Sequence, residues 1–164
     1  MAAKTFLKTV LTICAVIFLL AHLTFAALPK YDIIEKLVTE GIEVCGHTGL
    51  TPQTVSSFKQ VGRDEREANR VLEHAAGLAN AGCYLVVLEH IPAELGEEVT
   101  RSIDIPAIGI GAGSACDGQV LVINDLMGLG DRWPPFSKQY LHLAELLREA
   151  AARYAREVKQ RVFP

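Results

Sequence analysis

The 164-residue chain contains little cysteine, and its four cysteines are far apart. They show no CxxC pair and no other spacing typical of metal ligands, so the sequence indicates neither a zinc site nor a disulfide framework. Three of the four lie beside apolar or glycine-rich stretches, where a small buried thiol is the expected state. The cysteines are Cys14, Cys45, Cys83 and Cys116.

The chain also lacks a long block of charge of one sign. It has 16 lysines and arginines against 19 aspartates and glutamates, which gives a formal net charge of -3. This balance argues against a nucleic-acid partner, because such surfaces concentrate basic residues. The hydrophobic share of 50% and the charged share of 21% are ordinary for a globular protein, and the length leaves room for one domain.

Several motifs of catalysis and cofactor binding are absent as well. The sequence has no serine nucleophile elbow and no pair of histidines at metal-binding spacing on a helix. Gly109, Gly111 and Gly113 alternate in GIGAGSACDG, but the last spacing of the dinucleotide fingerprint is missing and no periodic helix follows at once. We interpret these glycines as places where a ligand or a neighbouring strand approaches the backbone closely.

A long apolar run stands at the amino terminus. MAAKTFLK carries two lysines, and the apolar stretch TVLTICAVIFLLAHLTFAAL follows with no formally charged residue except a possible His22. This pattern fits a signal peptide, and about 20 apolar residues could also span a bilayer as an uncleaved anchor. A soluble core helix is the alternative, but no polar face interrupts the run. We therefore predict a hydrophobic targeting or membrane-anchoring segment at residues 1–28, followed by a folded domain at residues 29–164.

The remainder alternates between helical and strand-like stretches. The predicted helices cover residues 31–41, 64–81, 92–102 and 137–162. The predicted strands cover residues 42–47, 83–88, 105–113 and 118–125, and a loop follows at residues 125–136. Asp64 and Glu67 form a capping-box pattern at the start of the second helix, and Gly82 ends it. The last helix has an apolar seam at residues 141, 144, 147, 151, 154 and 158.

This alternation predicts a parallel sheet covered by helices, because the strands are apolar without polar alternation. In such folds, ligands bind at the carboxyl ends of the strands. Each predicted strand end is polar or glycine-rich. The ends are Cys45-Gly46-His47, Glu89-His90, Gly109–Gly113 and Asn124-Asp125. We expect a site along this edge of the sheet.

Glu89 is the leading candidate for chemistry. It ends the apolar run LVVLE, where desolvation disfavours the charged carboxylate and suits it to act as a general base. The alternative is a structural glutamate paired with a basic group at the rim. His47 could hydrogen-bond a substrate carboxylate or carbonyl, or could be a structural rim residue. His90 should point away from Glu89, so we interpret it as structural or supporting.

Several segments together resemble the ketopantoate hydroxymethyltransferase family, from about Tyr31 to Pro164. They are CGHTGLTPQ, Gly62-Arg63, LVVLEHIPAEL, IPAIGIGAGSACDGQVLV and the closing VFP. The resemblance implies an α/β fold of the (β/α)8 TIM-barrel type. A complete barrel needs about 250 residues and eight strands. We therefore expect a partial barrel of about the last four strand–helix units, preceded by the N-terminal hydrophobic helix.

The resemblance also implies an activity. The family transfers a hydroxymethyl group from methylenetetrahydrofolate to 3-methyl-2-oxobutanoate, giving 2-dehydropantoate for pantothenate biosynthesis. A magnesium ion (Mg2+) chelates the keto acid and acidifies its C3 proton. Glu89 matches the family's catalytic base, and His47 matches a substrate-binding histidine. The family's metal ligands lie in the first half of the barrel, so none can be assigned here.

Departures from the family keep other interpretations open. The loop TVSSFKQVGR is shortened and lacks the expected glycine pair. A half-barrel has two open sheet edges and an apolar inner face, so we expect homo-oligomers, a partner half or membrane contact through residues 1–28. The chain could be an incomplete sequence, a degenerate copy or one completed by another chain.

The activity is therefore expected to be impaired in this chain. The alternatives are a non-catalytic, membrane-anchored or oligomer-forming remnant, and a carbon–carbon lyase of the same superfamily. The family resemblance implies a cytoplasmic location, whereas the N-terminal segment indicates membrane or secretory targeting.

Overall fold

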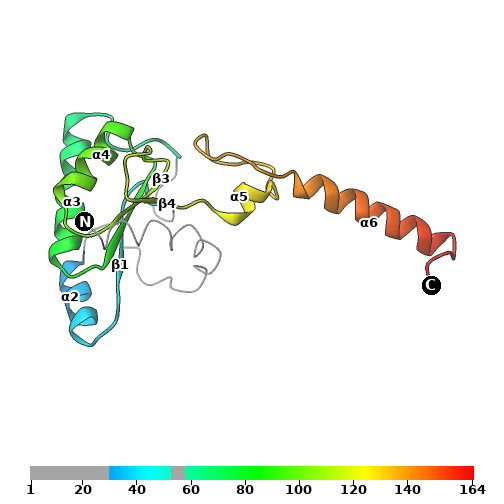
Figure 1. Cartoon of the computed structure of the whole chain (residues 1–164), viewed down its shortest axis with the longest axis horizontal. Coiled ribbons are helices and arrows are strands. Elements are labelled where there is room, and N and C mark those ends of the chain that lie inside the picture. Colours follow the sequence, from blue (N-terminus) through cyan, green and yellow to red (C-terminus); the bar gives the residue numbers. More distant parts are fainter. Residues whose placement is uncertain (1–29, 53–57) are drawn as a thin grey trace. The chain divides into compact units, whose positions relative to one another are not determined.

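A computed structural model describes residues 30–52 and 58–164 (Figure 1). The predicted targeting segment at residues 1–28 lies outside these residues. Among the helices in the described ranges, none is long and apolar enough to cross a membrane. The chain divides into two compact units, one ending at Val120 and the other running from Leu121 to Pro164.

The N-terminal unit is built on a four-stranded parallel sheet with strand order β1-β2-β3-β4. The strands are β1 (Cys45–Gly49), β2 (Leu85–Glu89), β3 (Ala107–Ile110) and β4 (Gly118–Gln119). The parallel α/β class predicted from the sequence is confirmed, and the arrangement is consistent with part of a TIM-like barrel. The register places Gly49 beside Glu89, and Glu89 beside Ile110.

All four predicted strands differ from the structure in their bounds, β2 and β3 by one to three residues at each end. Strand β1 begins and ends later than residues 42–47, because it extends only where β2 offers partners, up to the Gly49–Glu89 pair. His47 therefore lies in the middle of its strand. Only Gly118–Gln119 of the predicted strand 118–125 pairs with β3. Ile123–Met127 forms the short helix α5 instead, since a short apolar run fits a strand or a buried helix equally well.

The helices of the N-terminal unit follow the sequence pattern. They are α2 (Tyr31–Thr39), α3 (Glu65–Asn80) and α4 (Ala93–Ser102). The Glu67 N–H donates to Asp64 Oδ1 at 2.8 Å, which confirms the predicted cap. The Glu67 carboxylate accepts instead from the Gly62 N–H at 3.0 Å, so it ties the preceding loop to the helix start. Gly82 has φ +94° and ends the segment as predicted.

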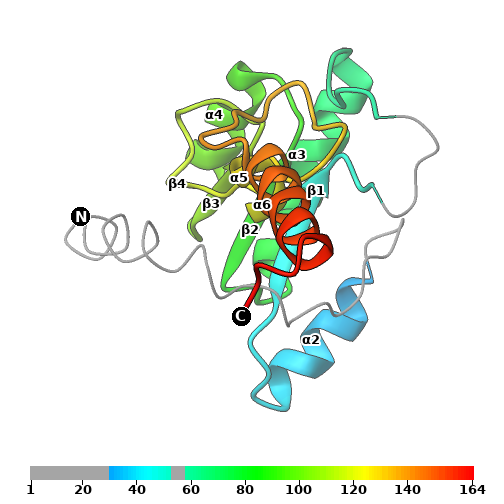
Figure 2. The same cartoon turned by 90° about the vertical axis from the view of Figure 1, so that its right-hand side faces the viewer.

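Helices α3 and α4 lie together on one side of the sheet (Figures 1 and 2). The core that they form with the sheet includes Val71, Ala75, Leu78, Val86, Leu88, Leu95 and Val99. Val86 and Leu88 of β2 face these helices, and a Cβ added at Gly46 would touch Leu78 of α3. Because side chains alternate along a strand, His47 and Glu89 belong to the opposite face of the sheet.

The glycine-rich stretch after β3 packs closely against α4. A Cβ added at Gly96 would collide with the carbonyl oxygen of Ala112, and one added at Gly113 would stand 2.6 Å from the Cβ of Ala93. A Cβ added at Gly109 would lie 3.0 Å from the side chain of Gln119 in β4. For Gly109 and Gly113, the prediction that these glycines permit close approach is confirmed, with a strand as the neighbour of Gly109 and a helix as the neighbour of Gly113.

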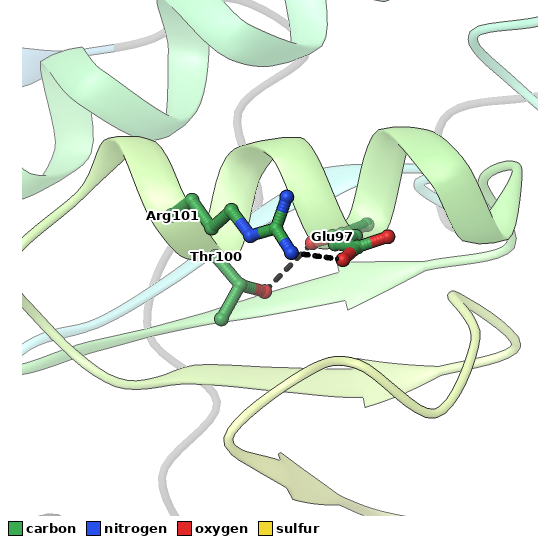
Figure 3. Close-up of polar contacts among 4 residues, drawn as sticks. Glu97, Thr100 and Arg101 are labelled. Atoms are coloured by element: carbon green, nitrogen blue, oxygen red, sulfur yellow. Dashed lines mark hydrogen bonds and ion pairs between the residues drawn. The ribbon is translucent and has the colours of Figure 1, made fainter.

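Helix α4 carries polar contacts between residues one turn apart (Figure 3). Arg101 forms an ion pair with Glu97 one turn earlier, and the Thr100 hydroxyl donates to the Gly96 carbonyl at 2.6 Å. The Arg101 side chain is 77% exposed. Exposed pairs of this kind contribute little to stability because water and salt screen them.

The C-terminal unit contains α5 and the helix α6 (Leu143–Lys159). The predicted helix over residues 137–162 is too long at both ends, since residues 137–142 make turn contacts such as the bond from the Ser137 N–H to the Pro134 carbonyl at 3.0 Å. Helix α6 has no buried residue. Its apolar seam includes Leu147, Tyr154 and Val158, all of which are exposed.

The packing of α4 against the glycine-rich stretch generates a stability prediction. Replacement of a glycine within a helix by alanine normally raises the free energy of unfolding by about 1 kcal/mol. At Gly96 the added methyl group would force the Ala112 backbone away, so we expect Gly96→Ala to lower the free energy of unfolding by about 1–3 kcal/mol. Urea unfolding followed by circular dichroism measures the change.

The matched control is Arg101→Ala on the exposed face of the same helix, which we expect to change the free energy of unfolding by no more than about 0.5 kcal/mol. A Gly96→Ala variant that is as stable as the wild type or more stable would contradict the close packing.

Candidate active site

The two residues singled out by sequence come together in the structure. His47 lies in the middle of β1 and Glu89 is the last residue of β2. The distance from His47 Nε2 to Glu89 Oε2 is 3.2 Å. The side chains are 15% and 13% exposed, respectively. Both belong to the sheet face opposite α3 and α4, so the strand register itself creates the pair.

In this pair, the Glu89 carboxylate can accept a proton and the His47 imidazole can donate a hydrogen bond. A carboxylate only accepts hydrogen bonds, whereas an imidazole can donate from one nitrogen or, when protonated, from both. The Glu89 partner is thus a histidine from the neighbouring strand. Because histidine is itself a basic group when protonated, this contact also fits the structural alternative of a glutamate paired with a basic group. The arrangement suits proton transfer to or from a bound substrate.

The end of β1 is fitted closely to the end of β2. The Leu50 N–H donates to the Glu89 carbonyl at 2.8 Å. Gly49 has φ +92°, and a Cβ added there would collide with that same carbonyl oxygen. Glycine is therefore required beside Glu89, both for its backbone conformation and for its lack of a side chain. Sequence reasoning missed this role, although the glycine that follows His47 and Thr48 in CGHTGL was the available signal.

His90 follows Glu89 and is buried. Its ring stacks on Phe58 with a centroid distance of 5.4 Å and an interplanar angle of 27°. Burial lowers the pKa of His90; the nearby Glu89 carboxylate opposes this shift, and the Arg63 guanidinium reinforces it. Its buried, stacked position agrees with the supporting role expected from the sequence.

One predicted strand end is not a strand end in the structure. Asn124 and Asp125 lie in α5 of the C-terminal unit and not at a strand end. Burial raises the pKa of the Asp125 carboxyl. The strand-end interpretation of these two residues was wrong, because the chain turns into a helix after β4.

The cysteines of the described residues are free thiols, as the sequence indicated. Cys83 and Cys116 are buried, and Cys45 is half-buried at the start of β1. Burial, with a smaller contribution from Cys83, raises the pKa of Cys45 to about 11, so this thiol is protonated at neutral pH. Cys14 lies outside the described residues.

The lowered pKa of His90 generates a prediction about acid stability. In the unfolded chain His90 takes up a proton near its ordinary pKa of 6.5, whereas in the folded chain it does so only at lower pH. The contribution of neutral His90 to the free energy of unfolding is therefore complete above pH 6.5 and is lost as the pH falls below it. We expect the free energy of unfolding to fall more steeply below pH 6.5 in the wild type than in His90→Asn.

Urea unfolding at several pH values between 7.5 and 5 measures this difference, with about 1.4 kcal/mol per pH unit as the upper bound for one proton. Burial also lowers the pKa of His74, but His74 is present in both proteins and cancels in the comparison. Equal slopes in the two proteins would contradict the burial of a neutral His90.

Comparison with known proteins identifies the family of the chain. The family profile described as ketopantoate hydroxymethyltransferase matches residues 24–164. Curated relatives named 3-methyl-2-oxobutanoate hydroxymethyltransferase include one from Pyrobaculum islandicum, 49% identical over 135 residues, which cover 80% of this chain and 52% of the relative. One from Picosynechococcus is 50% identical over 135 residues, covering 81% and 52%.

A third relative, from Trichodesmium erythraeum, is 48% identical over 134 residues, covering 80% of this chain and 51% of the relative. This chain thus spans about half the length of the curated relatives that it matches. The profile match covers most of the chain, and the identity is close to one residue in two. The chain therefore belongs to the ketopantoate hydroxymethyltransferase family.

Proposed function

We propose that the chain supplies the general base for hydroxymethyl transfer from methylenetetrahydrofolate to 3-methyl-2-oxobutanoate, which gives 2-dehydropantoate in pantothenate biosynthesis. The observation that carries this proposal is the mostly buried Glu89 carboxylate at the end of β2, 3.2 Å from His47. Family membership supports the choice of substrates, because the curated relatives are named for this reaction.

Glu89 takes the proton from C3 of the keto acid. The electron pair of that C–H bond moves toward the keto group and leaves an enolate. A carboxylate in a largely dry position accepts a proton without first shedding a full shell of water. Water replaces both folate nitrogens on the methylene carbon, which gives each nitrogen an N–H bond and releases the one-carbon unit at the oxidation level of formaldehyde. The enolate carbon then bonds to this carbon as its carbonyl electron pair moves to the oxygen, and that oxygen takes up the proton held by Glu89.

His47 binds the substrate in this proposal. Its imidazole can donate a hydrogen bond to the carboxylate or keto oxygen of the keto acid. A donor aimed at the keto oxygen stabilises the negative charge that develops there as the proton leaves. Because Glu89 and His47 stand on neighbouring strands, one small substrate can contact both.

The family resemblance implies Mg2+, but the described residues do not fit that ion. Mg2+ prefers an octahedron of oxygen ligands. Within residues 30–52 and 58–164, no group of three or more histidines, cysteines, aspartates or glutamates could hold a metal. Glu89 and His47 offer one carboxylate and one imidazole, so no metal-dependent step is assigned to them.

Self-association belongs to the same proposal. Within the described residues, β1 and β4 each pair with a single strand, which leaves two sheet edges with unpaired backbone groups. Helix α6 adds an exposed apolar seam that contains Leu147, Tyr154 and Val158. Open edges and exposed apolar seams are covered when chains associate, so we propose a homo-oligomer.

The role of Glu89 predicts the loss of proton exchange on mutation. We expect Glu89→Gln to lower the exchange of the C3 proton of 3-methyl-2-oxobutanoate at least about 100-fold, because glutamine cannot accept that proton. Nuclear magnetic resonance in D2O measures the exchange. The chain is assayed together with the part of the Pyrobaculum islandicum relative that lies outside the match, which the family resemblance identifies as its first half.

Glu97→Gln on the exposed face of α4 is the matched control and should exchange like the wild type. The chain alone should bind Mg2+ and the keto acid weakly, given the ligand set described above. Equal exchange in Glu89→Gln and the wild type would rule out this base. A folded mixture without any exchange would favour the non-catalytic alternative.

The exposed seam of α6 predicts concentration-dependent association. We expect Leu147→Lys to shift the chain toward a smaller species in size-exclusion chromatography with light scattering, because a buried charge opposes seam contacts. Glu149→Lys introduces the same residue on the same helix away from the seam and should leave the mass unchanged. A monomeric wild type, or an identical mass for both variants, would contradict the proposed interface.

A further inference from the structure

The backbone takes a rare conformation immediately after Glu89. His90 has φ +48°, in the left-handed region that residues other than glycine seldom adopt. Among the described residues, only Arg161 shares this feature without being glycine, and it lies near the carboxyl terminus. Such a conformation persists only where the surroundings fix it, and it is often found at functional sites.

Three contacts from two separate segments fix His90. Its N–H donates to the carbonyl of Ile110 at the end of β3, at 2.9 Å. Its carbonyl accepts from the N–H of Val61 at 3.0 Å, and its ring stacks on Phe58, both in the segment between β1 and α3. The side chain and both backbone groups of His90 are therefore engaged, and the residue is 8% exposed.

These contacts have a direct consequence for Glu89. Glu89 is held by the pairing of β2 with β1 and β3. The peptide bond that joins it to His90 is held at both ends, because the Glu89 carbonyl accepts from the Leu50 N–H and the His90 N–H donates to the Ile110 carbonyl. If a substitution prevented residue 90 from keeping its left-handed angle while bound to Val61, the strain would fall on this peptide and turn the Glu89 carboxylate away from His47.

We infer that His90 is a positioning residue for Glu89, whose left-handed backbone and stacked ring hold the carboxylate against His47. The catalytic meaning of this inference rests on the proposed function, in which Glu89 is the base. The geometric part, that His90 maintains the contact between Glu89 and His47, stands apart from that function.

Histidine meets both demands of the position. Glycine would adopt the backbone angle freely but would leave Phe58 without a stacking partner, and a β-branched residue would resist the angle. Burial also lowers the pKa of His90, so its ring is neutral at neutral pH and does not compete with His47 as a cation beside the carboxylate.

The first measurement tests the contact between Glu89 and His47 and does not depend on enzymatic activity. The ring nitrogen resonances of His47 in the full-length chain, assigned with His47→Gln, report on its contact with Glu89. The variant Glu89→Gln defines the signal of a lost carboxylate. We expect His90→Val to shift the His47 resonances toward that signal, and His90→Asn, which tolerates the left-handed angle, to stay near the wild type.

A milder variant covers the case in which His90→Val does not fold. His90→Ala carries a smaller conformational cost, and we expect it to give an intermediate shift of the His47 resonances. Dispersed amide spectra confirm folding in each variant. Unchanged His47 resonances in folded His90→Val or His90→Ala would overturn the inference. It would also be overturned if the His47 resonances did not change in Glu89→Gln.

A kinetic measurement tests whether the position of His90 affects the action of Glu89 as the base. In the combined assay with the relative's first half, we expect His90→Ala to lower kcat for C3-proton exchange by about tenfold to a hundredfold, because misplacement of a catalytic group by about 1 Å has such effects. KM should stay the same, since His47 is intact, and His90→Asn should restore most of kcat. A rise in KM with kcat unchanged would overturn the positioning role.

The two proposals fail in different ways. If Glu89→Gln retains proton exchange while the His90 variants still move the His47 resonances, the base is wrong and the positioning is right. If Glu89→Gln abolishes exchange while folded His90→Ala keeps both the resonances and kcat, the base is right and the positioning is wrong.

Discussion

The parallel pairing of β1 with β2 is the constraint on which the rest of the site depends. Its register sets Gly49 beside Glu89, and the two-residue period of the strands then places His47 and Glu89 on the same face. A slip of one residue would move one partner to the face packed by α3 and α4, where Val86 and Leu88 lie. If Glu89 were the residue that moved, burial of its carboxylate in the core without a partner would cost several kcal/mol of folding free energy.

The register is specified by packing as much as by hydrogen bonds. Gly46 faces Leu78, where even a methyl group would be crowded, and Gly49 faces the Glu89 carbonyl, where none fits. The same principle operates one strand further along, where Gly96 and Gly113 allow α4 to approach the segment after β3. Close backbone approach at these glycines lets three strand ends and one helix start meet at the edge that carries Glu89.

The sequence correctly predicted most of the elements whose ends are marked by local signals, such as a helix cap or a terminating glycine. Helix α3 has its cap at Asp64 and its stop at Gly82, and both lie where the pattern placed them. The identities of His47 and Glu89 also came from sequence, because each stands within a polar or glycine-rich interruption of an apolar run. Their mutual distance did not, since it depends on the register between strands about 40 residues apart in sequence.

The errors have a common physical origin. The bounds of β1 depend on its partner β2. After β4 the strand-like run VLVI does not extend the sheet, and its last residue, Ile123, begins α5. In both places the tertiary partner decides between conformations that the local sequence permits equally. The left-handed angle at His90 belongs to the same class, because only the contacts with Ile110, Val61 and Phe58 select it.

A carboxylate and an imidazole by themselves define only part of a carbon-acid reaction. The C3 proton of a keto acid is far less acidic than a carboxylic acid, so the proposed transfer to Glu89 requires stabilisation of the enolate oxygen in the transition state. In this proposal His47, which lies beside Glu89, is the donor that gives such stabilisation. The 3.2 Å contact keeps acceptor and donor within reach of one small substrate, which is why we propose proton transfer at this edge of the sheet.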